Sequence, residues 1–279
     1  MKAPVVLVNF PYRLAELGPE LYARKAVAVL THDVISERVE KFVGKGWPID
    51  FEPLTREQEA ALIDRAKVAI AISNEDRQKL QALAPDVHVI TGFPPMFEPD
   101  AVPARPKRQP GRLRCLFVGS GATHNRLTLD WLLKKAWPTG AEGIELQIVG
   151  SVGLALNQEE LPPSIQVRGR VPDISAAYDE ADLALALVLE GTGVKMKLLE
   201  AVRYGIPAIT TVEGLRGLPG DAAGAFPIVS DGVSLASLLS QLSESTDSLD
   251  DMAARQLAWA REHLAPDVLT HDLMKELIH

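Results

Sequence analysis

The sequence predicts an α/β protein built from two units, each with a parallel β-sheet. Short runs rich in valine, isoleucine and leucine alternate along the chain with longer amphipathic segments. Near-continuous apolar strands separated by helices are typical of parallel sheets that are covered on both faces. A proline-rich break divides the runs into two groups. The 279 residues, 47% of them hydrophobic, supply enough apolar side chains for two cores.

The apolar runs and the break set the expected order of elements. Before the break the runs are PVVLVNF (4–10), AVAVLTH (26–32), VAIAIS (68–73) and VHVITGF (87–93). After it they are RCLFVGS (114–120), ELQIVGS (145–151), IQVRGRV (165–171), LALALVL (183–189), PAITTV (207–212) and AFPIVS (225–230). The break itself holds six prolines in residues 94–112, which favours a linker. We therefore expect a first unit over residues 1–93, a second over 113–262, and a C-terminal helix over 263–279 that packs back on the first unit.

Composition excludes several classes of protein. The balance of 29 basic and 37 acidic residues, a net charge of −8, argues against a broad nucleic-acid footprint, which needs clustered lysine and arginine. Cys115 is the single cysteine, so we expect no intrachain disulfide and a reduced core thiol, which fits the cytoplasm. No apolar run reaches the roughly 18 to 20 residues of a membrane helix, although peripheral contact with the inner membrane face stays open.

A small-residue loop follows the first strand of the second unit. The stretch VGSGATHNR offers Gly119, Ser120 and Gly121, and close behind them lie Thr123, His124, Asn125 and Arg126. Loops of this kind, between a parallel strand and a helix, can bring backbone amides against a phosphate. A simple turn is the alternative interpretation.

A second candidate site lies in EGTGVKMKLLEAVRYGIPAIT, residues 190–210. Gly191 and Gly193 are expected in a strand-to-helix turn, and Lys197 in the first turns of the helix. An anion there would meet the positive end of the helix and an ammonium group together. Glu200, one turn on, would accept hydrogen bonds from hydroxyl groups. The alternative is a solvent-exposed Lys197–Glu200 pair.

The run from Gly169 to Leu218 resembles the donor-binding domain of the retaining glycosyltransferases grouped with family 4, which have the GT-B fold of two facing Rossmann-like domains. The resemblance is carried by Gly-x-Lys-x-Lys-x-x-Glu-Ala, then Gly-x-Pro, then Glu-Gly-x-x-Gly-Leu. It extends upstream through FVGSGATHNRLTLDWLLKKAWP (117–138) and, more loosely, through LTHDVISERV (30–39) and RAKVAIAISNEDRQKL (65–80). It thus touches both units.

The resemblance implies roles for individual residues in binding a nucleotide-diphosphate-sugar. Glu200 matches the glutamate that accepts hydrogen bonds from the ribose hydroxyls, and Lys197 matches the basic residue that meets the diphosphate. The Gly119–Gly121 loop matches the turn lying against the diphosphate. Val171 falls where the base is held by backbone contacts. His32 matches a histidine of the first domain that faces the donor sugar, although a packing or capping histidine is the alternative.

The resemblance also implies a reaction. A glycosyltransferase would move the sugar to a glycan, lipid-linked or small-molecule acceptor, with retention of configuration. The charge that builds on the departing diphosphate would be met by Lys197, by the amides near Gly193 at the helix N-terminus and by Arg126. We expect no metal and no cofactor besides the donor, since the sequence contains no Asp-x-Asp motif.

Two departures from the family pattern leave alternatives open. The residue eight positions before Glu200 is Thr192 rather than glutamate, and Glu190 is displaced by two. The first unit is also shorter than the family's first domain, so we expect an incomplete Rossmann-like domain on the acceptor side. The rival interpretations are a non-catalytic nucleotide-sugar-binding subunit or fragment that needs a partner chain, and a GT-B-like nucleotide-sugar epimerase.

Overall fold

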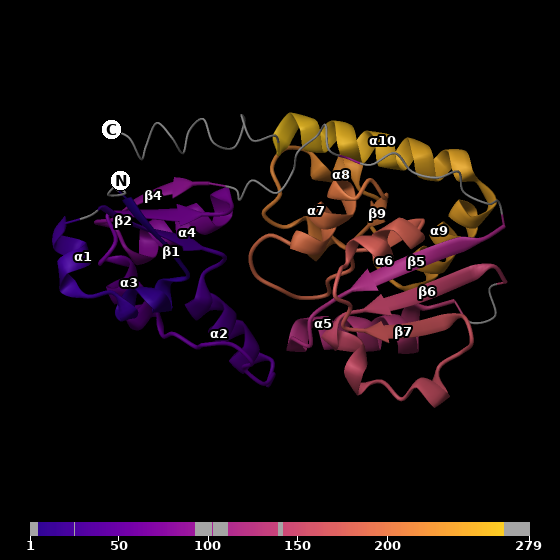
Figure 1. The fold of residues 1–279 in the computed structure, drawn as a ribbon, viewed down its shortest axis with the longest axis horizontal. Helices are drawn as coiled ribbons and strands as arrows, with labels where there is room; N and C mark the ends of the chain where they lie inside the picture. The colour runs from indigo at the N-terminus through magenta and orange to yellow at the C-terminus, as the bar shows by residue number, and fades with distance from the viewer. Residues whose placement is uncertain (1–4, 25, 93–101, 103–110, 139–141, 265–279) are drawn as a thin grey trace.

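The computed structural model describes residues 5–24, 26–92, 102, 111–138 and 142–264. Its strands form two parallel sheets, which lie in separate halves of the molecule (Figure 1). The first is four-stranded in the order β1-β2-β3-β4, and the second is five-stranded in the order β7-β6-β5-β8-β9. The predicted α/β fold with parallel sheets is confirmed.

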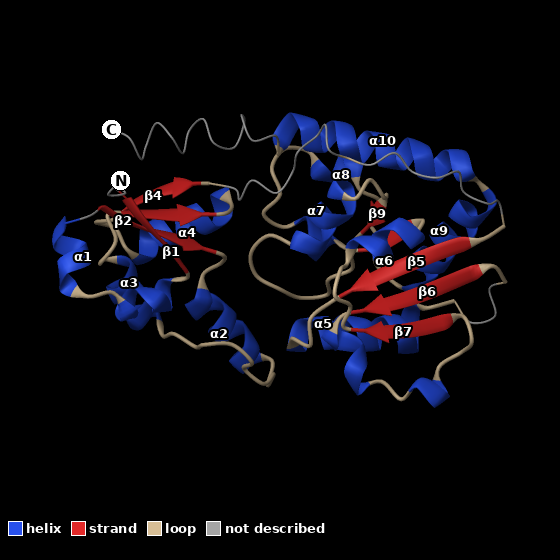
Figure 2. Ribbon diagram, viewed as in Figure 1, coloured by secondary structure: helices blue, strands red, loops and turns tan. Residues whose placement is uncertain are grey.

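The first unit alternates strands and helices in simple succession. Its elements are β1 (Val5–Asn9), η1 (Pro11–Glu16), α1 (Pro19–Arg24), β2 (Ala26–Thr31), α2 (Ile35–Gly44), α3 (Arg56–Ile63), β3 (Val68–Ala71), α4 (Asn74–Leu83) and β4 (His88–Thr91). Buried valines and alanines of β2, β3 and β4 pack against Ile63 of α3 and Leu80 of α4. The arrowheads of these strands point toward the second unit in Figure 2.

A buried carboxylate fixes the start of α2, a helix that extends toward α5 of the second unit in Figure 1. Glu59 of α3 is fully buried and accepts hydrogen bonds from the backbone N–H groups of Ile35 and Ser36, both at 2.8 Å. It therefore replaces the local side-chain cap that Val34 cannot provide. Burial raises the pKa of Glu59, although these hydrogen bonds oppose the shift. The position of α2 thus depends on a contact between two helices.

The second unit has the strand order of an open doubly wound sheet. Its elements are β5 (Leu113–Val118), α5 (Thr123–Trp131), η3 (Leu132–Ala136), β6 (Ile144–Val149), η4 (Ser151–Ala155), η5 (Gln158–Glu160), β7 (Ile165–Gly169), α6 (Ser175–Glu180), β8 (Leu183–Leu185), α7 (Met196–Arg203), β9 (Ala208–Ile209), η6 (Val212–Leu215), α8 (Ala222–Ala225), α9 (Gly232–Glu244) and α10 (Thr246–His263). The chain moves from β5 out to β7 and then returns to place β8 beside β5. That reversal creates a topological switch point at the carboxyl ends of β5 and β8.

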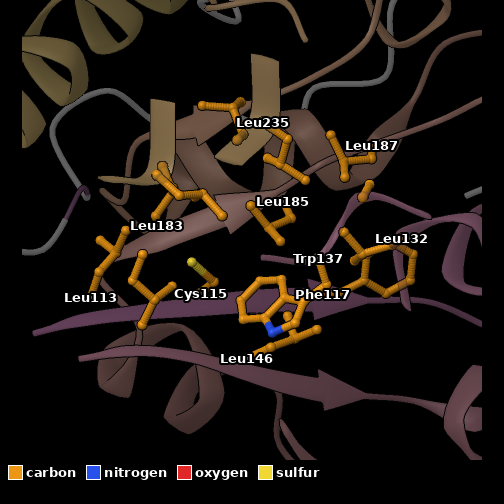
Figure 3. Packing of buried hydrophobic residues seen from close by; sticks show 14 of the residues in the cluster. Leu113, Cys115, Phe117, Leu132, Trp137, Leu146, Leu183, Leu185, Leu187 and Leu235 are labelled. Carbon is orange, nitrogen blue, oxygen red and sulfur yellow. The ribbon is translucent and has the colours of Figure 1, made fainter. Parts of the chain in front are cut away.

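Helices cover both faces of the second sheet (Figure 2). Leu116 of β5 packs with α6 and α7, whereas Cys115 and Phe117 face α5 and α9. Figure 3 shows Cys115 and Phe117 among leucines of β5, β6 and β8. Cys115 is 1% exposed, and burial raises the pKa of its thiol. The predicted core position of this cysteine is confirmed.

One predicted strand is wrong. Residues 225–230 contribute only an isolated bridge between Thr210 and Ile228, and α8 ends at Ala225. Pro227 interrupts this run, and a proline cannot donate a ladder hydrogen bond. The expected linker over 94–112 and the expected helix over 263–279 lie largely outside the described residues. Over the described ranges, no helix is long and apolar enough to cross a membrane.

Candidate nucleotide-sugar site

The switch point brings the two candidate motifs together. The Gly119–Gly121 loop follows β5, and the glycine loop of residues 190–195 follows β8 and leads into α7. Because β5 and β8 are paired neighbours, both loops leave the same edge of the sheet. Ligands of open parallel sheets bind at such an edge.

The Gly119–Gly121 loop is a tightly packed turn. The N–H of Gly119 donates to Val149 O at 3.0 Å, and the N–H of Gly121 donates to Ser151 Oγ at 2.8 Å. A Cβ on Gly119 would lie 3.3 Å from Val152, so the close packing favours glycine. Ser120 is exposed. Both glycine amides are therefore already satisfied within the protein, and Ser120 is the residue of the loop open to a ligand.

Asn125 links this loop to the helix after β8. It is 6% exposed, and its Nδ2 donates to the Ser120 carbonyl at 3.2 Å and to Ser120 Oγ at 3.1 Å. Its Oδ1 accepts a hydrogen bond from Lys197 Nζ at 3.0 Å. Asn125 and Lys197, 72 positions apart in the sequence, are thus joined by a hydrogen bond to a buried amide.

Lys197 is a half-buried cation held by neutral groups. Besides Asn125, its ammonium lies 3.4 Å from Leu187 O and 4.9 Å from the centre of the Phe117 ring. It makes no ion pair with any residue that the structure describes. Burial, with the nearby Lys195 charge, lowers its pKa to about 8. The predicted alternative of a solvent-exposed Lys197–Glu200 ion pair does not match this geometry.

Glu200 lies one turn further along α7. Its carboxylate accepts a hydrogen bond from the buried Tyr178 hydroxyl at 3.3 Å, and the Tyr178 ring stacks on Tyr204 with centroids 4.4 Å apart. Burial raises the pKa of Glu200. The Glu200 side chain is half-buried, so its remaining oxygen lone pairs can accept hydrogen bonds from hydroxyl groups.

The glycine loop before α7 touches the first unit. Gly193 has φ +63°, and a Cβ there would lie 2.4 Å from the carbonyl oxygen of His32. Next to it, Thr192 Oγ1 donates to Asp33 Oδ2 at 2.6 Å. Glu190 pairs with Lys41 at 2.8 Å and also with Lys45. The residues at and near the family's glutamate position therefore bind the first unit.

His32 of the first unit lies beside the glycine loop. Its Nε2 lies 2.6 Å from Asn9 Oδ1, and its ring packs against Phe10 at 4.3 Å between centroids. Burial lowers its pKa, although Asp33 opposes the shift. The ring is thus held in place by the ends of β1 and β2, beside the backbone contact with Gly193.

Two predicted site residues lie further out. Arg126 is exposed, and its Nη2 donates to Thr123 Oγ1 at 3.2 Å. The N–H of Thr123 is capped across the interface by Asp50 Oδ2 at 2.6 Å, where α2 points toward α5 in Figure 1. Val171 is half-buried against the α6–α7 core, just after Gly169 at φ +64°. Among the described residues, neither Arg126 nor Val171 forms a hydrogen bond with Lys197.

The structure adds two titratable groups near Lys197, namely Lys195 and His124, to which the sequence motifs assign no individual role. Lys195 Nζ donates to the carbonyls of Thr192 at 2.8 Å and Gly193 at 2.6 Å, and burial lowers its pKa to about 8. His124 is half-buried beside Lys197, and burial with that charge lowers its pKa to about 4. Lys195 stands in the same quoted motif as Lys197, so the repeated Lys-x-Lys spacing is the signal that could have identified it.

A charged cavity of about 420 Å³ lies between the two units. Its walls come from α2, α4, the start of α3, and two loops of the second unit, at Thr192–Gly193 and Arg216–Gly217. Of its lining residues eight are ionisable: Glu37, Glu40, Lys41, Arg56, Glu75, Asp76, Lys79 and Arg216. Because Thr192 and Gly193 line the cavity, it adjoins the glycine loop that leads to Lys197.

Comparisons with known proteins agree with this arrangement. Residues 112–245, just under half of the chain, match the family described as glycosyl transferases group 1. No curated protein sequence matches the chain.

Solved structures match nearly the whole chain. The structure of Anabaena HepE in complex with UDP-glucose matches with a TM-score of 0.70 at 15% identity, covering 98% of this chain and 78% of that one. Sucrose-phosphate synthase from Thermosynechococcus elongatus matches with a TM-score of 0.69 at 15% identity, covering 99% and 74%. S. aureus TarM in complex with UDP matches with a TM-score of 0.70 at 10% identity, covering 97% of this chain but 54% of that one.

At these low sequence identities the structural matches establish the fold alone. The match to the family model concerns only residues 112–245. The protein therefore has a GT-B-like α/β fold, and its residues 112–245 match the family described as glycosyl transferases group 1.

Proposed function

We propose that this protein is a glycosyltransferase that takes a sugar from a nucleotide-diphosphate-sugar at the switch point of its second unit. The observation that carries the proposal is Lys197, a half-buried ammonium without an ion-pair partner among the described residues, at the start of α7. A buried unpaired charge is costly, and a bound anion would compensate it. HepE and TarM, which share the fold, have been solved with UDP.

The start of α7 is suited to an anion in a second way. Its first turn carries no acidic residue, and its N-cap, Lys195, makes no capping hydrogen bond through its side chain. The first backbone N–H groups of the helix and its dipole would therefore favour a phosphate. We assign the diphosphate to this helix end, to Lys197 and to the exposed Ser120, with Gly193, Gly119, Gly121 and Arg126 shaping the surroundings.

In the proposed reaction the bond between the anomeric carbon and the diphosphate oxygen breaks, a bond from that carbon to the acceptor hydroxyl oxygen forms, and the hydroxyl proton passes to the departing diphosphate. Negative charge grows on the leaving diphosphate, where Lys197 and the helix end stabilise it without a metal. Glu200 accepts hydrogen bonds from the ribose hydroxyls, and Val171 lies beside the base. His32 approaches the sugar from the first unit. Retention of configuration follows from the family resemblance.

The proposal divides the work between the two units. Residues 113–262 bind the donor, and residues 1–93, joined by the linker 94–112, supply the acceptor side. The acceptor is a glycan, a lipid-linked molecule or a small molecule. The proposed location is the cytoplasm, with peripheral contact at the inner membrane face.

The test is a titration of the purified protein with UDP-, GDP- and ADP-sugars, followed by turnover assays. The proposal expects one nucleotide to bind, and its sugar to be transferred to an added acceptor. Binding without turnover would instead support a binding subunit that needs a partner chain. Conversion of the donor with no acceptor present would support an epimerase. Absence of binding to all three donor classes would overturn the proposal.

A further inference from the structure

Asn125 occupies a central position in the candidate site. Its side chain is nearly completely buried, yet all the polar atoms of its amide have a described partner. The NH₂ group holds Ser120 on the β5 loop, and the oxygen holds Lys197 on α7. One amide therefore sets the distance between the two segments that are proposed to meet the diphosphate.

An amide side chain can bridge Ser120 and Lys197 in a way that a carboxylate could not. It offers a donor to Ser120 and an acceptor to Lys197 at the same time. Its oxygen is uncharged, so it holds the ammonium without neutralising it. The other described contacts of Lys197, with Leu187 O and the Phe117 ring, are uncharged as well. The cation is thus immobilised, but its charge stays available to an anion.

We propose that Asn125 is a positioning residue of the donor site, which fixes the Lys197 ammonium against Ser120 while leaving its charge free for the diphosphate. This inference rests on the proposed function. It assigns to Asn125 an effect on phosphate recognition that acts through Lys197, with no contact between Asn125 and the sugar.

The charges around Lys197 determine how the positioning role of Asn125 can be measured. Lys195 and the half-buried His124 lie on the adjoining segments, and Glu200 lies one turn away on the same helix. Burial and Lys195 lower the pKa of Lys197 to about 8, and Glu200 opposes them. A carboxylate in place of the Asn125 amide, 3.0 Å from the ammonium, would raise that pKa and compensate the charge.

The experiment compares Asn125→Asp with wild type by calorimetry, using UDP, GDP and ADP and their nucleosides from pH 6.5 to 9.5. In wild type the affinity of the preferred diphosphate should fall as pH rises above about 8. In Asn125→Asp it should be at least about tenfold weaker at pH 7, the decline should move to higher pH, and nucleoside affinity should stay the same. Asn157→Asp, in an exposed turn far from the switch point in sequence, is the matched control and should behave as wild type.

A second variant keeps the test valid if the aspartate disturbs folding. Asn125→Ala removes both contacts without adding charge, so diphosphate affinity should fall several-fold while the pH of the decline stays near that of wild type. Unchanged diphosphate affinity and pH profile in the folded Asn125 variants would overturn the inference, even if Lys197→Ala weakens binding. If Lys197→Ala itself leaves diphosphate binding unchanged, the proposed phosphate site is wrong as well.

Discussion

Arg216 donates hydrogen bonds to both carboxylate oxygens of Glu75, at 3.1 and 2.6 Å, and so joins the second unit to α4 of the first. Lys79 approaches the same carboxylate at 2.9 Å. Close by, a Cβ on Gly217 would lie 3.2 Å from Ser73 of the first unit, which shows how near the two backbones come. The Glu-Gly-x-x-Gly-Leu motif of residues 213–218 therefore serves as a contact between the units.

Arg216→Gln should loosen this contact. Because the pair is partly exposed, its attraction is screened as salt rises, with a Debye length of about 30 Å at 0.01 M and about 3 Å at 1 M. Distances between labels on the two units should broaden in the variant at low salt, and should broaden in wild type only at high salt. Arg168→Gln, which breaks the 2.7 Å ion pair to Glu180 within the second unit, is the control and should leave the distances unchanged. Equal distances in Arg216→Gln and wild type would refute this prediction.

The Glu75–Arg216 ion pair should make the stability of the protein depend on pH. Arg216 and Lys79 lower the pKa of Glu75 from 4.5 to about 2, although partial burial opposes them. A carboxyl group whose folded pKa is depressed stabilises the protein above its unfolded pKa and loses that effect as pH falls through the folded value. Comparing denaturant unfolding of wild type and Glu75→Gln should show a difference at pH 6 that shrinks between about pH 4.5 and pH 2. A difference independent of pH would contradict the ion-pair explanation.

Lys197→Ala should weaken nucleoside diphosphate binding without abolishing it, because the N–H groups at the start of α7 stay in place. The loss should shrink as salt rises, since the ammonium–phosphate attraction is screened more than hydrogen bonds from buried amides. Calorimetry with the matching nucleoside is the control, and its affinity should hardly change. Equal weakening of nucleoside and diphosphate would mean that Lys197 supports the fold instead.

Glu200→Gln should weaken nucleotide binding by roughly 1.5–3 kcal/mol, the usual contribution of a hydrogen bond to a charged group. The 2′,3′-dideoxy nucleotide should bind wild type and variant alike, because it lacks the hydroxyls that Glu200 is proposed to accept. Thermal unfolding of the variant in the absence of nucleotide serves as the check on the fold. The ribose assignment fails if both nucleotides lose affinity to the same extent.

Gly193→Ala should destabilise the contact between the units. The added Cβ meets the His32 carbonyl, and φ +63° alone costs a residue other than glycine about 1–2 kcal/mol. Gly46→Ala is a matched control, since Gly46 has φ +65° but open space around its Cα. Denaturant unfolding should show the backbone cost in both variants, and label distances should broaden in Gly193→Ala alone. Broadening in neither variant would show that the His32 contact does not hold the units together.

The apolar runs predicted nearly all the strands because the inner strands of both parallel sheets consist largely of buried apolar side chains. The prediction failed at 225–230, where Pro227 allows only a bridge to Thr210. The sequence also placed Lys197 in the first turn of α7 and Glu200 one turn later, as the structure has them. These are local properties, which spacing along the chain determines.

The partners of those residues could not be predicted in the same way. Asn125 reaches Lys197 only because the chain returns from β7 to place β8 beside β5. Likewise, Gly193 was predicted as part of a ligand loop, and the structure adds that it lies against His32 of the first unit. Such contacts depend on which strands become neighbours, and a single sequence does not state that order.

Helix α10 contributes to the integrity of the second unit. Gln256 of α10 is 1% exposed and pairs with both backbone groups of Ala208, accepting from N–H at 2.8 Å and donating to O at 2.7 Å. It thereby completes the hydrogen bonding of β9, as a further strand would. A fragment cut at residue 245, where the family match ends, would bare that strand edge and the apolar surface beneath Trp259. Such a fragment should self-associate, so a stable second unit must extend through α10.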